Sequence, residues 1–174
     1  MIKLFMVSML HENGRHATKS MPANRIGTSG ANNLFLVCPF CQIENFIVKE
    51  TGAVFFLTAP AAIFHIYDND FFDPIDRLIR EENISHLYVV ADTSCMFVRN
   101  VLENRNKRGI ACESLIRELA TDYDTNESLA AKVVTQEIQL LSRKKLFAER
   151  IAAGTLSMYA LLTNKSDNSI TIIA

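Results

Sequence analysis

The chain has 174 residues, of which 49% are hydrophobic and 21% are charged, and its formal net charge at pH 7 is −1. This length suits one domain with a sizeable core, and the near-zero net charge gives no electrostatic reason to expect a nucleic acid or an anionic membrane as a partner. No apolar run approaches the roughly 20 residues that a membrane-spanning helix needs. We therefore expect a globular protein with neither nucleic-acid nor membrane partners.

The N-terminal stretch MIKLFMVSML contains one lysine and a brief apolar segment without a small-residue cleavage site, so it is too short for a convincing signal peptide. Four cysteines in a chain of this length do not form the pattern of a disulfide framework. We predict a cytoplasmic location, with the cysteines present as reduced thiols or as metal ligands.

Residues 1–33 are predicted to form an N-terminal arm, since the stretch from residue 11 onward is polar and rich in Gly, Asn and Ser. Three short runs that are apolar throughout follow it, and such continuous hydrophobicity is typical of strands covered on both faces, as in a parallel sheet. These runs are LFLV at 34–37, AVFFL at 53–57 and LYVV at 87–90. Between the last two, a helix is predicted to begin with Asp73 as its N-cap and Pro74 in its first position.

Helical patterns dominate the second half of the chain. Residues 95–109 predict a helix that ends at a glycine, and residues 126–147 predict the longest helix, with Asn126 as a cap. Residues 154–174 predict a hairpin around the polar turn NKSDN. Strands that alternate with helices predict a single α/β domain over residues 34–174, with a mainly parallel central sheet flanked by helices and a C-terminal hairpin.

Candidate metal ligands follow two of the predicted strands. Cys38 comes directly after the first apolar run, in the stretch LFLVCPFCQIEN, and Asp92 and Cys95 come directly after the third, in VVADTSC. The carboxyl ends of parallel strands meet at one edge of a sheet, where the sites of α/β proteins lie. We therefore expect two thiols and a carboxylate to meet at that edge. Cys41 follows Cys38 by three residues.

From about Met21 to the C-terminus, the chain resembles the β-class carbonic anhydrases. The segment CPFCQI stands where that family has Cys-x-Asp-x-Arg after its first core strand, and VVADTSCM stands where it has Gly-His-Thr/Ser-x-Cys-Gly after its third. The family's Arg-Asn-Ala-Gly element, which follows its second strand, corresponds to the segment GAVFFLTAPAAIF. The resemblance implies a β-carbonic-anhydrase-like fold, a homodimer or higher homo-oligomer built on a continuous sheet, and a small-molecule substrate for an active member.

Carried over residue by residue, the resemblance implies that zinc is held by Cys38, Asp92 and Cys95, with Asp92 in the place of the family's His. Zinc accepts carboxylate oxygen, so a Cys-Asp-Cys set is chemically sound. The family also has an Asp–Arg pair, in which Arg holds Asp and Asp orients the zinc-bound water. Phe40 and Gln42 replace that pair here. Phe can neither accept a proton nor bind a metal, and Gln carries no charge.

These substitutions predict a zinc-binding homologue with strongly reduced or no carbon dioxide hydratase activity, and we assign no catalytic residue. Replacing a neutral imidazole with a carboxylate makes the site more negative, and a more negative site makes the zinc-bound water a weaker acid. Hydration needs the pKa of that water near neutrality. The alternative is an active zinc lyase that hydrates carbon dioxide or a related small electrophile. An open coordination position with a water would favour the enzyme.

Cys41 has three interpretations. It can be a small buried side chain, because free cysteine often behaves as a small hydrophobe. It can complete a structural site with Cys38, Asp92 and Cys95, since C-x-x-C followed by D-x-x-C has the spacing of four-coordinate zinc sites. It can also form a redox pair with Cys38. Asp92, for its part, has an alternative role as a turn or cap residue in the segment ADTS.

The remaining candidates receive structural roles. Cys112 matches no ligand position, so we predict that it packs in the core. The four histidines are predicted to have surface or capping roles. Among them, His65 follows the second predicted strand and is placed to approach the site.

Overall fold

The structure is a computed structural model that describes residues 4–6, 33–51, 55–103 and 110–174. Six strands form one sheet in the order β1-β3-β2-β4-β5-β6. The four central strands are parallel, and β1 and β6 pair antiparallel at the two edges. The strands are β1 (Leu4–Met6), β2 (Asn33–Val37), β3 (Phe55–Thr58), β4 (His86–Asp92), β5 (Ser157–Asn164) and β6 (Ser169–Ile172).

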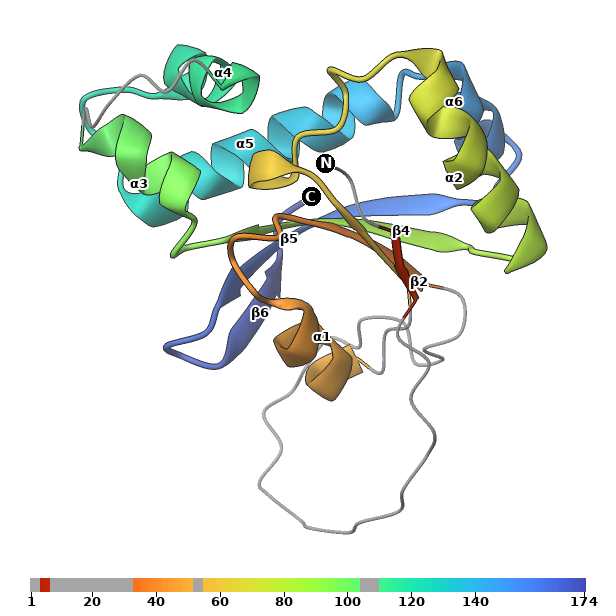
Figure 1. Ribbon diagram of the computed structural model, residues 1–174, viewed down its shortest axis with the longest axis horizontal. Coiled ribbons are helices and arrows are strands. Elements are labelled where there is room, and N and C mark those ends of the chain that lie inside the picture. The colour runs from red at the N-terminus through yellow and green to blue at the C-terminus, as the bar shows by residue number, and fades with distance from the viewer. Residues whose placement is uncertain (1–3, 7–32, 52–54, 104–109) are drawn as a thin grey trace, which may run out of the picture.

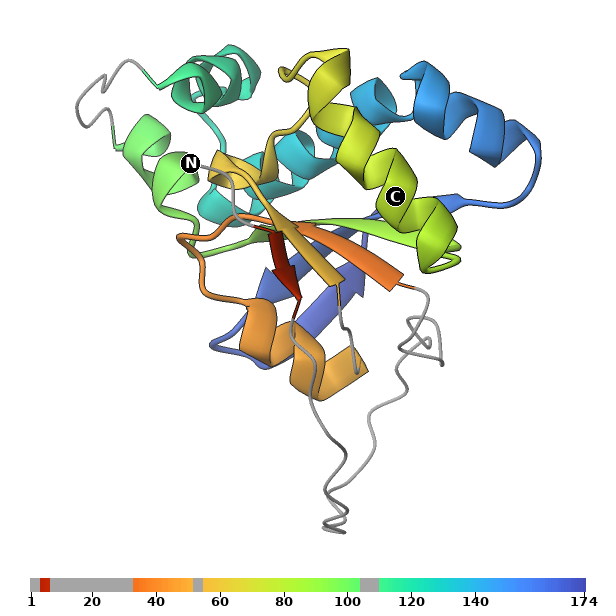
Figure 2. The same ribbon diagram turned by 45° about the vertical axis from the view of Figure 1, so that its right-hand side comes forward.

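Helices cover both faces of the sheet. One face carries α1, and the opposite face carries α5, with α2 and α6 toward one end and α3 and α4 toward the other (Figures 1 and 2). The helices are α1 (Glu44–Thr51), the short 3-10 turn η2 (Pro60–Ala62), α2 (Asn69–Glu81), α3 (Met96–Leu102), α4 (Ala111–Leu119), α5 (Asn126–Leu141) and α6 (Lys145–Ala152). Within the described ranges, no helix combines the length and apolarity that crossing a bilayer requires.

The predicted α/β architecture is confirmed. Every residue of β2 is buried, as are all residues of β4 except His86, because each strand lies between two helical or loop layers. This is the environment that the continuous apolar runs indicated. The predicted C-terminal hairpin is also present, with Leu162 of β5 opposite Thr171 of β6.

The predicted start of α2 was wrong. The helix expected from Asp73 begins at Asn69, where Asp68 is the N-cap and accepts a hydrogen bond from Phe71 N at 3.2 Å. Burial of Phe72 against Phe147, with ring centroids 5.8 Å apart, stabilises the additional first turn. Pro74 therefore lies inside the helix rather than at its start.

The long helix predicted over residues 126–147 is two helices. Thr125, not Asn126, caps the first of them, in a reciprocal capping box with Ser128. The first helix ends at Leu141 and the second begins at Lys145. The short break redirects the second helix toward α2 (Figure 2).

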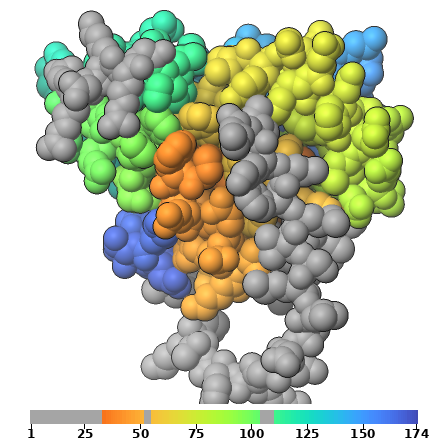
Figure 3. All heavy atoms as spheres, in the orientation of Figure 1, coloured from red at the N-terminus to blue at the C-terminus, as the bar shows by residue number. Residues whose placement is uncertain are grey.

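The N-terminal arm falls largely beyond what the structure describes, and α3 ends earlier than predicted. Of the predicted arm over residues 1–33, Leu4–Met6 forms β1 and Asn33 begins β2, and residues 7–32 lie outside the described residues. The helix predicted over 95–109 is observed as the shorter α3, which ends at Leu102 with Glu103 as its C-cap, so the predicted end at Gly109 was wrong; residues 104–109 lie outside the described residues. In the space-filling view, the segment that contains β2 and α1 (orange) lies beside both α3 (green) and the β5–β6 hairpin (blue) (Figure 3).

Candidate metal centre

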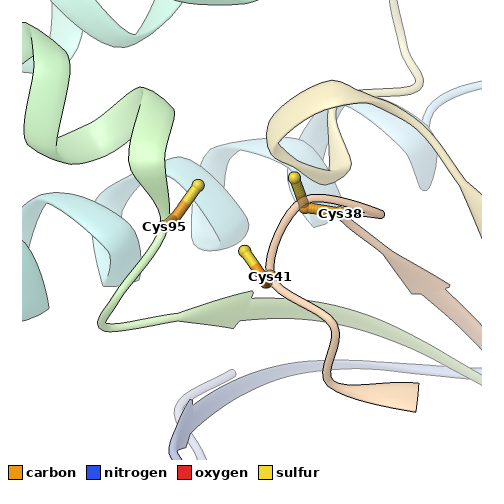
Figure 4. A group of neighbouring side chains, drawn as sticks. All are labelled: Cys38, Cys41 and Cys95. Carbon is orange, nitrogen blue, oxygen red and sulfur yellow. The ribbon is translucent and has the colours of Figure 1, made fainter.

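Three cysteines converge at the carboxyl edge of the sheet. Cys38 and Cys41 lie on the loop that follows β2, and Cys95 directly precedes α3 (Figure 4). Their sulfur atoms all lie within 4.8 Å of one another. Exposure of the three residues is only 1%, 3% and 4%, and all three are free thiols. The fold therefore builds a compact, buried cluster of three sulfur donors, which we call the thiol cluster.

Two tight turns direct the three sulfurs toward one another. In the first, Cys41 N donates to Cys38 O at 3.1 Å, and Gln42 then takes a left-handed conformation with φ of 51°. That conformation is uncommon for a residue other than glycine and turns the chain into α1. In the second, Cys95 N donates to Asp92 O at 3.0 Å. Lys165 Nζ fixes the first turn from the β5–β6 hairpin by donating to Cys41 O at 2.6 Å.

Asp92 lies beside the thiol cluster in sequence, but the structure does not bring it into the group of donor atoms. Its carboxyl group is fully buried, and Oδ1 accepts hydrogen bonds from both the backbone N–H and the hydroxyl of Ser94. Thr163 Oγ1 donates to Oδ2 at 2.7 Å, since Thr163 on β5 is the register partner of Asp92. Both oxygens are thus engaged in a turn, so ligation by Asp92 stays a prediction that requires these bonds to be exchanged.

The three thiols share hydrogen bonds, and these bonds set their acidity. Bonds from Cys38 and Cys41 lower the pKa of Cys95 to about 3, against the effect of burial. For Cys38, the bond with Cys41 lowers the pKa, but the bond with Cys95 and burial outweigh it and raise the pKa to about 12. Bonds to Cys38 and Cys95, together with burial, raise the pKa of Cys41 far above its ordinary value. Hydrogen bonding within the cluster thus lowers the pKa of Cys95 and, together with burial, raises the pKa values of Cys38 and Cys41.

The segment after β3 supplies a further contact to the cluster. Ala61 N, in the η2 turn, donates a hydrogen bond to Cys38 Sγ at 3.2 Å. Ala61 and Ala62 both have positive φ, of 57° and 56°. A backbone N–H that donates a hydrogen bond to a sulfur favours the thiolate form of the cysteine. Groups that hydrogen-bond to metal ligands in this way orient the ligands and tune the metal site.

Phe40 and Gln42 lie on the same loop as the cluster. Phe40 is 57% exposed, and its ring packs edge-on against Phe97, with centroids 5.3 Å apart. Gln42 is exposed. Neither residue type provides a carboxylate, so the two positions that correspond to the Asp–Arg pair carry an aromatic contact and a polar turn residue here.

Sequence reasoning missed Glu137. This residue lies on the buried face of α5, and its side chain is 1% exposed. Its Oε1 accepts from Phe64 N at 2.8 Å and from His65 N at 2.9 Å, and its Oε2 lies 2.5 Å from His65 Nδ1. The spacing did carry a signal, because Glu137 falls four residues from both Val133 and Leu141 on the apolar stripe of the helix.

Cys112 lies apart from the thiol cluster, on α4. It is buried, and burial raises the pKa of its thiol to about 12. Such a neutral, buried thiol packs as a small hydrophobe, which agrees with the role predicted for it.

Comparison with known proteins identifies the fold in which the thiol cluster lies. The sequence matches no protein-family profile and no curated protein. Among solved structures, it is similar to the β-carbonic anhydrase CafA of Aspergillus fumigatus, with 18% identity, a TM-score of 0.68, and coverage of 83% of this chain and 76% of that one. One of two tetrameric β-carbonic anhydrases from Sordaria macrospora gives 17% identity, a TM-score of 0.66, and coverage of 83% and 81%.

A third similar structure is the Coccomyxa β-carbonic anhydrase in complex with acetazolamide, with 12% identity, a TM-score of 0.66, and coverage of 83% of this chain and 72% of that one. At these identities the likeness concerns the fold. The chain has the β-carbonic anhydrase fold, an α/β fold with a mainly parallel central sheet, and this prediction is confirmed. Within that fold, the described residues gather three cysteines that could hold a metal ion.

Proposed function

We propose that this protein binds zinc through the thiolates of Cys38, Cys41 and Cys95, and that it has little or no carbon dioxide hydratase activity. The observation that carries the proposal is the convergence of three buried sulfur atoms within 4.8 Å of one another. Thiolate is a preferred ligand of zinc in proteins. The proposal keeps Cys38 and Cys95 from the predicted set and takes Cys41 as the third ligand.

The dimensions of the cluster support this assignment. Sulfur ligands about 2.3 Å from a tetrahedral zinc lie about 3.8 Å from one another. Sulfurs that already lie within 4.8 Å of each other therefore need to move by about 1 Å or less. Burial and hydrogen bonding raise the pKa values of Cys38 and Cys41, and a bound divalent cation would favour their thiolate forms.

The same donor set argues against efficient hydration chemistry. When bound, zinc supplies a Lewis acid that polarises or acidifies an oxygen ligand. Three thiolates more than neutralise a divalent ion, which weakens that effect. Phe40 and Gln42 hold the positions of the family's Asp and Arg, and neither side chain can take up a proton as a carboxylate does. Asp92 is held in its turn by Ser94 and Thr163.

Zinc content and a hydration assay test the two halves of the proposal together. Protein purified without added metal or chelator is expected to contain about one zinc per chain, and the zinc-loaded protein is expected to hydrate carbon dioxide at a rate close to the uncatalysed background. Stopped-flow measurement with a pH indicator gives the rate. A turnover typical of enzymes, about 1 to 1,000 per second or faster, would favour the alternative of an active zinc lyase.

We also propose that the protein is a homodimer or a higher homo-oligomer. The tetrameric state of the Sordaria macrospora β-carbonic anhydrases, which share this fold, supports the proposal. Size-exclusion chromatography with light scattering is expected to give a molar mass of at least two chains of 19.6 kDa. The mass of one chain over the micromolar range would contradict it.

A cytoplasmic location, where thiols stay reduced, remains part of the proposal.

A further inference from the structure

We infer that Glu137 is a positioning residue for the thiol cluster, because it anchors the segment whose backbone N–H contacts the Cys38 sulfur. The inference rests on the proposed function only for its consequence on zinc affinity. The contacts themselves do not involve a metal, so they can be tested in protein from which metal has been removed.

The segment over residues 59–65 begins beside the end of β2. At its start, Ala59 N donates to Val37 O at 3.1 Å, and two residues later Ala61 N donates to Cys38 Sγ at 3.2 Å. The η2 turn that contains Ala61 lies beside Cys38 in the close-up of the cluster (Figure 4). The segment therefore contacts both the strand and the sulfur.

The backbone of this segment is strained, so it needs an anchor. Ala61 and Ala62 are consecutive residues in the left-handed region, with φ of 57° and 56°. Residues with a Cβ adopt that conformation only when the surrounding structure enforces it. The hydrogen bond from Ala59 N to Val37 O of β2 fixes the start of the segment, and a second fixed point is required beyond Ala62.

Glu137 is that second point. Its carboxyl group reaches out of α5 and satisfies two consecutive backbone donors, Phe64 N at 2.8 Å and His65 N at 2.9 Å. The second oxygen lies 2.5 Å from His65 Nδ1. The side chain of Glu137 is 1% exposed and that of His65 is 19% exposed, so the contacts are largely shielded from water. Three contacts from one buried side chain thus fix the far end of the segment.

This connection makes Glu137 an outer contact of the proposed metal site. Glu137, on α5, accepts hydrogen bonds from the backbone N–H groups of residues 64 and 65. These bonds fix the end of the turn in which Ala61 N donates to the sulfur of Cys38. Loss of such outer contacts typically lowers metal affinity by about 10- to 100-fold. The direct ligands do not change, so the expected effect is weakened binding rather than abolished binding.

Alkylation of metal-free protein tests the positioning role directly. Cys38 and Cys112 are both buried, at 1% and 2% exposure, and the segment donates its hydrogen bond from Ala61 N to the sulfur of Cys38. Glu137→Leu is expected to raise the rate at which iodoacetamide alkylates Cys38 by about tenfold or more, since the cover opens locally, with the rate at Cys112 unchanged. Glu137→Gln keeps an oxygen acceptor for both backbone donors and is expected to stay within about threefold of the wild-type rate.

Control variants separate positioning from general loss of stability. Asp76→Ala removes the ion pair with Arg150 (2.6 Å) between α2 and α6, away from the cluster, and is expected to leave the Cys38 rate unchanged. If Glu137→Leu does not fold, His65→Ala removes one of the three contacts and is expected to raise the Cys38 rate by a few-fold. An unchanged rate at Cys38 in the folded variants, or equal increases at Cys38 and Cys112, would overturn the inference.

The zinc affinity of the same variants distinguishes a failure of the proposed zinc binding from a failure of the proposed role of Glu137. Competition with a chromophoric chelator is expected to give a dissociation constant about 10- to 100-fold higher for Glu137→Leu and close to wild type for Glu137→Gln. If wild-type protein binds no zinc, the proposed function fails, and the alkylation rates still decide whether Glu137 positions the segment. Wild-type affinity in Glu137→Leu would show that the contact to Cys38 has no role in metal binding.

Discussion

Replacing Cys41 with Ser is expected to weaken zinc binding by about a hundredfold or more, as strongly as replacing Cys95 with Ser. Structural zinc sites in small proteins have apparent binding free energies of about 10–16 kcal/mol, and each thiolate contributes a large share. The sulfur of Cys41 lies within 4.8 Å of both partners, so its loss leaves two donors. Competition with a chelator of known affinity measures the dissociation constants of the wild-type protein and both variants.

Two matched substitutions complete this experiment. Cys112→Ser makes the same thiol-to-hydroxyl change at a buried cysteine outside the thiol cluster, and it is expected to leave zinc affinity unchanged. Asp92→Asn keeps an oxygen that can accept from Ser94 and removes the carboxylate, so it too is expected to retain zinc. Loss of zinc in Asp92→Asn with retention in Cys41→Ser would instead establish the Cys38, Asp92 and Cys95 set that the resemblance implied.

Removing zinc is expected to lower the thermal unfolding midpoint by about 10 °C. A ligand that binds only the folded state stabilises it by about 4 kcal/mol at a thousand times its dissociation constant. In a chain of this size, each kcal/mol shifts the midpoint by about 2–4 °C. The cluster joins the β2–α1 loop to the start of α3, and Cys38 and Cys95 are 57 positions apart in the sequence. Zinc would therefore cross-link two segments that are distant along the chain.

Scanning calorimetry with and without a chelator measures this shift. Cys95→Ser is the control, because a variant that holds no zinc is expected to unfold at one temperature under both conditions. A wild-type midpoint that does not respond to chelation would contradict a role of the metal in holding the loops together.

Much of the fold could be predicted because its strands have a distinctive pattern. The runs at 34–37 and 87–90 are apolar throughout, and burial on both faces is the physical reason. Because parallel strands end at the same edge of a sheet, their arrangement places Cys38 and Cys95 at one edge. The pairing of these two residues in the structure follows from that rule.

The third member of the cluster could not be derived in the same way. Whether Cys41 or Asp92 joins Cys38 and Cys95 depends on the direction of two turns. The left-handed conformation of Gln42 carries the first turn, and the hydroxyl of Thr163, 71 residues along the chain, holds Asp92 in the second. Neither this dihedral angle nor this long-range hydrogen bond can be predicted from the spacing of residues in the sequence.

The predicted helix boundaries were wrong for a related reason, because contacts distant in the sequence decide where the helices begin. Local cap chemistry favoured Asp73 and Asn126, but packing of Phe72 against Phe147 extended α2 and the reciprocal bonds of Thr125 and Ser128 fixed the start of α5. Tertiary contacts of this kind routinely override a local preference. The buried acidic residue on α5 was missed because a single charged residue in a helical pattern is usually exposed.

Zinc K-edge X-ray absorption of protein loaded with one equivalent of zinc tests the central claim most directly. The account predicts three sulfur neighbours at about 2.3 Å, one for each of Cys38, Cys41 and Cys95. Two sulfur neighbours, with the remaining shell made of oxygen or nitrogen at about 2.0–2.2 Å, would contradict it and show that Cys41 is not a ligand.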